Sequence, residues 1–211
     1  MPASLDAWAG VFAEFAALLG SDADGTRVFE VLLRSALEGA PDAAGLMVSN
    51  YLSGEPVTGV AEGRPLVVRT PGSRLDLGTF VRAQLLALFA TLRIGMDVLL
   101  DEEGVRLDRL LAHGGLFRTA GVAQGVLAAA LDTPVSVGAA ASEGGAWGIA
   151  VLAAFAVAGG GDLAGYLDDV VFRDAEVDTV APDPDDVAAF ARFVERFRAA
   201  LPLQTAAAAV T

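Results

Sequence analysis

The chain has 211 residues, 54% of them hydrophobic, and its net charge of −13 comes from 27 acidic residues against 14 basic ones. Such a surface repels phosphate backbones and anionic headgroups, so the composition argues against binding to nucleic acid or to a membrane surface. The absence of cysteine excludes disulfides and Cys-type zinc sites. A single histidine excludes two-histidine metal motifs, and the absence of lysine excludes a Walker A loop.

Targeting signals are not visible in the sequence. The longest apolar run, residues 146–158, is shorter than the roughly 20 residues that a membrane-spanning helix needs. No basic region precedes an apolar segment at the N-terminus. We therefore expect a cytoplasmic protein that contacts no membrane.

The first half of the chain begins with helices and continues with strands. Apolar residues at helical spacing predict helices over residues 5–19 and 25–37, each followed by a glycine. Residues 44–52 and 64–70 are typical of strands, because turn-forming residues bound them on both sides. Residues 77–100 contain few polar side chains and predict a long helix that is buried over much of its surface.

The second half alternates strands with helices. We expect neighbouring parallel strands at residues 107–112 and 134–137, because strand–helix alternation is typical of parallel α/β folds. The other elements that we expect are helices at 119–131, 143–158 and 187–201, a helical turn at 162–170, an acidic loop at 174–186 and a frayed tail at 205–211. No repeat or linker divides the chain, so we predict one domain in which residues 1–40 are a helical lead-in without strand partners.

The junction between the strand and helix around residues 110–125 is the main candidate site. Its sequence, LLAHGGLFRTAGVAQG, places Gly114 and Gly115 where the carboxyl end of a strand meets a helix. Glycines there let the backbone approach a ligand, and open α/β sheets bind ligands at this end of their strands. The alternative is a tight turn with no ligand. The full G-x-G-x-x-G pattern is absent, and His113 has no nucleophile partner that would make it a base.

A second glycine-rich junction begins at residue 143. The predicted helix at 143–158 consists largely of small residues and has little side-chain bulk. Such a helix is expected where another backbone or a flat ligand must approach closely. The alternative is an interior helix packed tightly on a sheet. Taken together, the two junctions suggest a slot for a planar base with a phosphate tail.

These segments resemble the FGGY carbohydrate kinases. The family's Gly-Gly-Gly-Ala-Arg-Ser-like run is similar to residues 113–118, although His113 replaces the first glycine and Arg118 stands at the usual serine. Its Glu-Ala-x-x-x-Gly-Ala-Ala helix is similar to residues 143–150. The Pro-Tyr-Leu-x-Gly-Glu-Arg and Arg-Ala-x-x-Glu-Gly segments resemble residues 50–56 and 82–87, where Pro56, Leu86 and Ala87 depart from the pattern.

The resemblance implies an α/β fold, namely a partial ribonuclease-H-like lobe of the actin-like ATPase type, with residues 41–211 as the nucleotide-side C-terminal lobe of a sugar kinase. The Gly-Ile-Asp-x-x-Thr and Gly-Thr-Ser motifs of the family are absent, so the match covers only its C-terminal portion. The implied function is transfer of the ATP γ-phosphoryl group, with Mg²⁺, to the hydroxyl of a ketopentose such as xylulose or ribulose.

The resemblance also implies which residues hold the nucleotide. They are His113, Gly114, Gly115, Leu116, Phe117, Arg118, Glu143 and Gly144. Gly114 and Gly115 would lie against adenosine and the α-phosphate, and Leu116 and Phe117 would line the adenine. Glu143 is open to a plainer interpretation as an acid in the first turn of a helix. No residue of this chain is expected to ligate metal or to act as the catalytic base.

Partners follow from the same resemblance. We expect the base and most sugar contacts in an N-terminal kinase lobe that this chain lacks, and we allow for a homodimer. The isolated chain is predicted to be inactive. The alternatives are a truncated, inactive nucleotide-binding or regulatory module, and a fragment with no role of its own.

Overall fold

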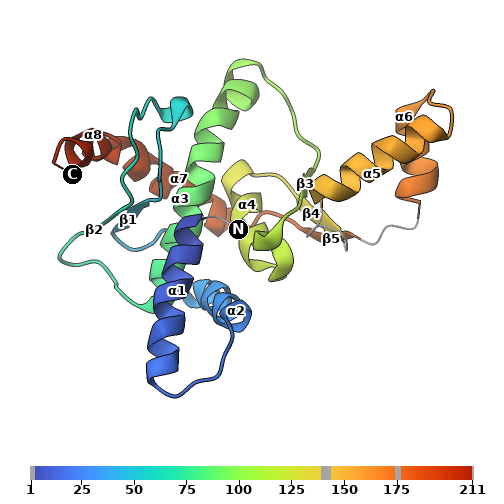
Figure 1. The fold of residues 1–211 in the computed structure, drawn as a ribbon. Helices are drawn as coiled ribbons and strands as arrows, with labels where there is room; N and C mark the ends of the chain where they lie inside the picture. The colour runs from blue at the N-terminus through green and yellow to red at the C-terminus, as the bar shows by residue number, and fades with distance from the viewer. Residues whose placement is uncertain (1–2, 139–143, 174–176, 211) are drawn as a thin grey trace.

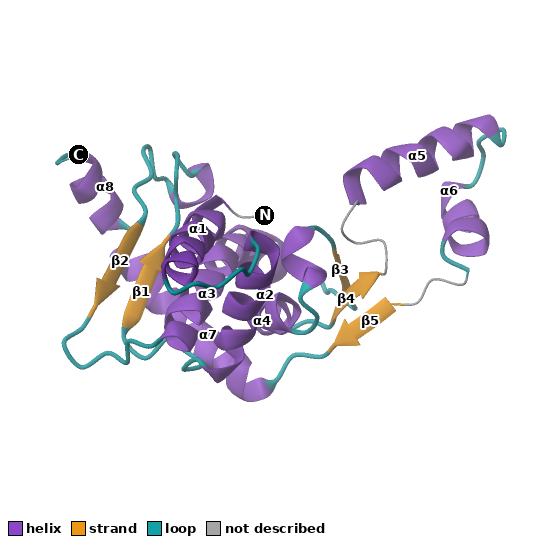
Figure 2. Ribbon diagram, turned by 60° about the horizontal axis from the view of Figure 1, so that its bottom comes forward, coloured by secondary structure: helices purple, strands orange, loops and turns teal. Residues whose placement is uncertain are grey.

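The computed structural model describes residues 3–138, 144–173 and 177–210. A body of helices lies between two small sheets, and a helical arm extends beyond the second sheet (Figures 1 and 2). The principal helices are α1 (Ala3–Leu18), α2 (Gly25–Ser35), α3 (Leu77–Asp97), α4 (Val122–Leu131), α5 (Gly144–Val157), α6 (Leu163–Tyr166), α7 (Pro184–Ala200) and α8 (Pro202–Ala208). The strands are β1 (Leu46–Ser49), β2 (Leu66–Arg69), β3 (Leu110–Ala112), β4 (Val135–Gly138) and β5 (Val177–Val180). The short helical turns are η1 (Ala36–Glu38), η2 (Pro56–Thr58), η3 (Val98–Glu102), η4 (Gly115–Arg118) and η6 (Leu167–Val171).

Helix α3 forms the centre of the core, as its lack of polar residues predicts. Its first half is almost entirely buried, and α2, α4, α7 and β1 all pack against it. Asp76 caps its N-terminus by accepting a hydrogen bond from the Thr79 amide at 2.8 Å. The segment Leu77–Glu102 is apolar and long enough to cross a membrane by length and composition, a feature that the sequence analysis did not identify. In this fold the first half of the segment packs in the protein interior, whereas Leu92, Val98 and Leu99 in its second half are exposed.

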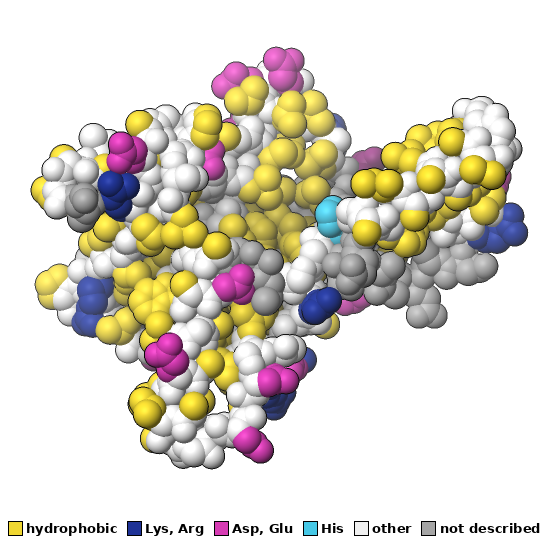
Figure 3. Space-filling view, viewed as in Figure 1, with side chains coloured by type: hydrophobic (Ala, Val, Ile, Leu, Met, Phe, Trp, Pro, Cys, Tyr) yellow, Lys and Arg dark blue, Asp and Glu magenta, His cyan; other side chains and the backbone are white. Residues whose placement is uncertain are grey.

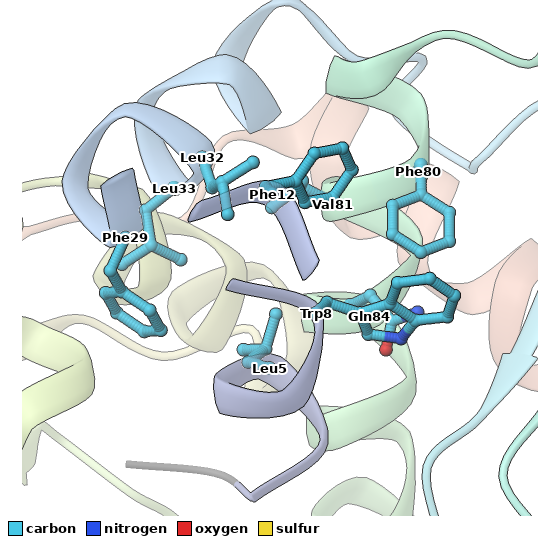
Figure 4. Close-up of a pocket in the computed structure, with 9 residues that line it drawn as sticks. All are labelled: Leu5, Trp8, Phe12, Phe29, Leu32, Leu33, Phe80, Val81 and Gln84. Carbon is cyan, nitrogen blue, oxygen red and sulfur yellow. The ribbon is translucent and has the colours of Figure 1, made fainter. Parts of the chain in front are cut away.

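The two N-terminal helices pack on α3 through aromatic and aliphatic side chains. Trp8 of α1 meets Phe80 of α3 edge to face, with ring centroids 4.8 Å apart (Figure 4). Leu5 and Phe29 lie nearby, around a small cavity that Gln84 also lines. The expected apolar face of α1 is buried only at its start, since residues further along, such as Phe15, are exposed.

The expected parallel strand pair is confirmed. β3 and β4 run parallel, with Leu110 opposite Val135, although β3 is shorter than the predicted strand. The other two strand pairs, for which no direction was predicted, are antiparallel. β1 pairs with β2 antiparallel in a separate sheet, and β5 pairs with β4 antiparallel to give the order β3-β4-β5.

Two sequence predictions in the C-terminal part were wrong. The segment expected to be an acidic loop contains β5, whose Thr179 hydroxyl lies 2.6 Å from that of Ser136 on β4. The segment expected to be a frayed tail belongs largely to α8. Gln204 of α8 holds it in place, since its side chain accepts from the Arg64 amide at 2.7 Å and donates to the Arg64 carbonyl at 2.8 Å.

Helix α5 lies in the arm rather than inside the fold (Figures 1 and 3). Ile149 is 72% exposed and Leu152 is 54% exposed, so an apolar surface of this helix faces solvent. Within the arm, Trp147 contacts Phe172 and Phe155 contacts Tyr166. The alternative of an interior helix packed on a sheet is therefore not what the structure shows.

Candidate functional site

The Gly-Gly junction is a sharp turn at the carboxyl end of β3. Gly114 has a φ of 109°, a backbone conformation that side-chain-bearing residues rarely adopt. Its carbonyl accepts a hydrogen bond from the Phe117 amide at 3.0 Å, which closes the single helical turn η4. Gly121 then begins α4 with a φ of 79°. Backbone conformation thus requires glycine at Gly114, whereas Gly115 has no positive φ.

Two buried side chains anchor this turn to the rest of the fold. Leu116 is 6% exposed and belongs to the hydrophobic core, and Thr119 is 6% exposed. Behind the turn, the Gln124 side chain of α4 donates hydrogen bonds to the carbonyls of Val135 and Asp178, each at 2.9 Å. These hydrogen bonds connect α4 to β4 and β5. They fix the position of the helix that follows the turn.

A groove of about 580 Å³ opens beside the turn, within the size range of small-ligand sites. The turn forms one wall, and α1 and α2 form the others. The lining residues are Asp6, Ala9, Gly10 and Ala13 from α1, Gly25, Thr26, Phe29 and Glu30 from α2, and Gly115, Arg118 and Thr119 from the turn. Small side chains on α1 keep the groove wide, and Phe29 lies beneath it as part of the hydrophobic core.

The charges in the groove are unevenly distributed. Asp6 and Glu30 lie on the two helices, and Arg118 lies on the turn. Glu30 accepts hydrogen bonds from Arg34 and Arg27, both at 3.0 Å, and these bonds lower the pKa of its carboxyl group. The charge of Glu30 is thus offset by two arginines, which leaves Asp6 as the carboxylate that faces Arg118 across the groove without an ion pair among the residues that the structure describes.

The structure brings only some of the predicted site residues to this groove. Gly115 and Arg118 line it, whereas Leu116 points into the core and Phe117 packs partly against that core. Gly114 shapes the turn without lining the groove. His113 is exposed at the end of β3 and is not among the lining residues.

No described residue of α5, where the second predicted junction continues, lines the groove. Glu143 lies outside the described residues, and Gly144 is the first residue of α5. A Cβ atom added to Gly145 or Gly148 would have no neighbour within 4 Å. The close approach of a second backbone, expected from these small residues, is absent at these two glycines.

Sequence reasoning missed the contribution of α1 and α2. The sequence does contain a pattern that indicates an open helix face. Ala9, Gly10 and Ala13 are small residues at helical spacing on the side of α1 away from Trp8. Only the folded chain shows that this side faces the glycine turn. The groove can hold a ligand with an apolar, flat part and an anionic part near Arg118.

The part of the chain that the structure describes contains no cluster of metal-ligating side chains. No group of three or more His, Asp or Glu side chains gathers there in a way that could hold an ion. The described residues therefore offer no site that would hold Mg²⁺ through protein ligands alone.

Comparisons with solved structures support the fold. A xylulose kinase from Rhodospirillum rubrum matches with a TM-score of 0.63 and 26% identity, over 93% of this chain and 37% of that one. A gluconate kinase from Lactobacillus acidophilus matches with a TM-score of 0.65 and 19% identity, over 93% and 39%. A glycerol kinase from Plasmodium falciparum, solved with ADP, matches with a TM-score of 0.56 and 17% identity, over 90% and 37%. No curated protein matches the sequence.

The structural matches confirm a mixed α/β chain with the fold of the C-terminal lobe of these sugar kinases, which is of the actin-like ATPase type. The chain spans less than two fifths of the length of each of these solved kinases. Residues 5–157 match the FGGY family of carbohydrate kinases, C-terminal domain. The chain therefore belongs to the FGGY family of carbohydrate kinases, as a representative of its C-terminal domain.

Proposed function

We propose that this chain is the ATP-binding part of a sugar kinase that transfers the γ-phosphoryl group of ATP to a hydroxyl of a ketopentose, such as xylulose or ribulose. One observation carries the proposal: in a chain of this family, the Gly114–Gly115 turn borders a groove of about 580 Å³. The glycerol kinase solved with ADP supports an adenine nucleotide as the ligand. The xylulose kinase, the most identical of the three, supports a ketopentose acceptor.

The chain's own residues would bind and orient the nucleotide. Gly115 gives its backbone access to the ligand, the small residues of α1 leave room for the base, and Arg118 attracts phosphate. His113, Gly114, Leu116 and Phe117 would act through the shape of the turn, and Glu143 and Gly144 remain proposed contacts of the nucleotide. Mg²⁺ supplies charge neutralisation in phosphoryl transfer and would arrive with the nucleotide.

The acceptor side would come from another part of the enzyme. We propose a companion N-terminal lobe that binds the sugar and carries the catalytic base, with the whole enzyme in the cytoplasm. Phosphoryl transfer requires donor, acceptor and base in line, and such orientation contributes roughly 7–11 kcal/mol. The alternative function is an inactive nucleotide-binding or regulatory module.

A phosphorylation assay tests the proposal. The isolated chain is incubated with ATP, Mg²⁺ and either xylulose or ribulose, beside the Rhodospirillum rubrum xylulose kinase as a positive control. We expect no sugar phosphate from the isolated chain. Turnover comparable to that of the control would contradict this expectation, because the acceptor site and base would then lie among these residues.

A fusion distinguishes the two candidate functions. The matched portion of the Rhodospirillum rubrum enzyme is replaced by this chain, and ADP binding is measured together with turnover. Activity with xylulose that is lost on Gly115→Val supports the kinase. Intact ADP binding without any turnover favours the inactive module.

A further inference from the structure

The groove contains a carboxylate whose hydrogen-bonding capacity is not used inside the protein. Asp6 lies in the first turn of α1, is half-buried and lines the groove. Among the residues that the structure describes, it has no hydrogen-bond or ion-pair partner. Glu30, on the opposite helix, has both carboxylate oxygens engaged by Arg27 and Arg34. Asp6 is thus the acceptor that faces the groove and is available to a ligand.

Charge decides which part of a nucleotide can lie beside Asp6. Phosphate groups are repelled by Asp6 and attracted by Arg118, whereas the charge of Glu30 is offset by Arg27 and Arg34, so the phosphates belong at the turn. The nucleoside then lies between α1 and α2. There it presents two neighbouring ribose hydroxyls, which donate hydrogen bonds, and a carboxylate is the side chain that commonly accepts from such hydroxyls in nucleotide sites.

We infer that Asp6 accepts hydrogen bonds from the ribose hydroxyls of the bound nucleotide and thereby selects ribonucleotides over deoxyribonucleotides. The inference rests on the proposed nucleotide-binding function and adds both a specificity-determining residue and the direction in which the nucleotide lies. Because Asp6 also stands in the first turn of a helix, where an acid stabilises the helix dipole, its role in binding must be separated from a role in folding.

Calorimetric titration of the whole chain with ADP and with 2′-deoxy-ADP provides the test. We expect ADP to bind about tenfold more tightly than 2′-deoxy-ADP, the loss typical of one hydrogen bond to a charged group. In Asp6→Ala this ratio should fall to about one. Glu14→Ala changes an exposed acid on the same helix and should keep the ratio of the unsubstituted chain. Thermal unfolding of each variant shows whether the fold is retained.

The outcomes separate this inference from the proposed function. Equal affinity for ADP and 2′-deoxy-ADP, or an unchanged ratio in Asp6→Ala, overturns the role of Asp6 while nucleotide binding stands. Inosine diphosphate lacks the exocyclic amine of adenine, so its affinity should fall in Asp6→Ala as much as that of ADP. An affinity for it that is unaffected by Asp6→Ala would assign Asp6 to the base and overturn the inference. Absence of binding by every nucleotide would overturn the proposed function itself.

Discussion

Single glycines shape the candidate site in different ways. Gly114 is required by its left-handed backbone, with a φ of 109°. Gly10 has no such requirement, because a Cβ atom added there would meet nothing within 4 Å and it stands in the middle of α1. Gly10 lines the groove, and the absence of a side chain there keeps the groove wide. Conformational and spatial roles of glycine can therefore be tested separately.

Substitution of Gly10 should separate stability from binding. Gly10→Ala should stabilise the chain by about 0.5–1 kcal/mol, because glycine inside a helix costs that much relative to alanine. Gly10→Leu should keep this gain but weaken ADP binding by obstructing the groove. Urea unfolding measures the first effect and calorimetry the second. Unchanged ADP affinity in Gly10→Leu would place the nucleotide elsewhere.

At the scale of elements, capping determines where the central helix begins. Asp76 accepts a hydrogen bond from the Thr79 amide, the largest of the contributions that lower the pKa of Asp76, and Arg74 also contacts its carboxylate. A lowered pKa in the folded state means that the ionised cap stabilises the fold above the ordinary pKa of aspartate, about 4. This contribution is lost as the pH falls through the lowered value.

Removal of this cap gives a pH-dependent prediction. Asp76→Ala should lower the free energy of unfolding at pH 7, because it removes the N-terminal cap of α3. The difference from the unsubstituted chain should shrink near pH 3, where protonation of Asp76 weakens the cap. Asp76→Asn retains a capping oxygen and serves as the control. A difference that grows toward low pH would contradict the assigned direction of the pKa shift.

The arm should also determine how the chain behaves in solution. Ile149 and Leu152 stand one helical turn apart on α5 and are 72% and 54% exposed. Exposed apolar patches lower solubility. The double variant Ile149→Glu, Leu152→Glu should therefore scatter less light at high protein concentration, with little change in its unfolding temperature. Leu85→Glu, at a fully buried position of α3, should unfold the chain. Unchanged scattering in the double variant would show that this surface is covered in solution.

At the scale of the whole molecule, local patterns predicted the elements that rely on local signals. The helices, the parallel pair β3–β4 and the glycine turn follow from periodicity, glycine positions and strand–helix alternation. β5 and α8 do not, because long-range contacts hold them. Asp178 of β5 receives a hydrogen bond from Gln124, and α8 is held by the bonds between Gln204 and the Arg64 backbone.

The candidate site was predictable to a similar extent. The turn at Gly114 and Gly115 has a sequence signature, and the resemblance to the sugar kinases pointed to it. The opposite walls come from α1 and α2, whose residues lie about a hundred positions earlier in the chain. The two helices lie beside the turn because both pack against α3. No local sequence pattern predicts this arrangement.

The proposed function depends most directly on nucleotide binding at the glycine turn. Calorimetric titration with ADP is carried out on the unsubstituted chain, on Gly115→Val and on Gly125→Val, a control in α4 where an added Cβ atom meets nothing within 4 Å. We expect ADP to bind the unsubstituted chain and the control with equal affinity and to bind Gly115→Val more weakly, with the fold of all three retained. Equal affinity in all three proteins would contradict this expectation, because the glycines would then serve only the turn.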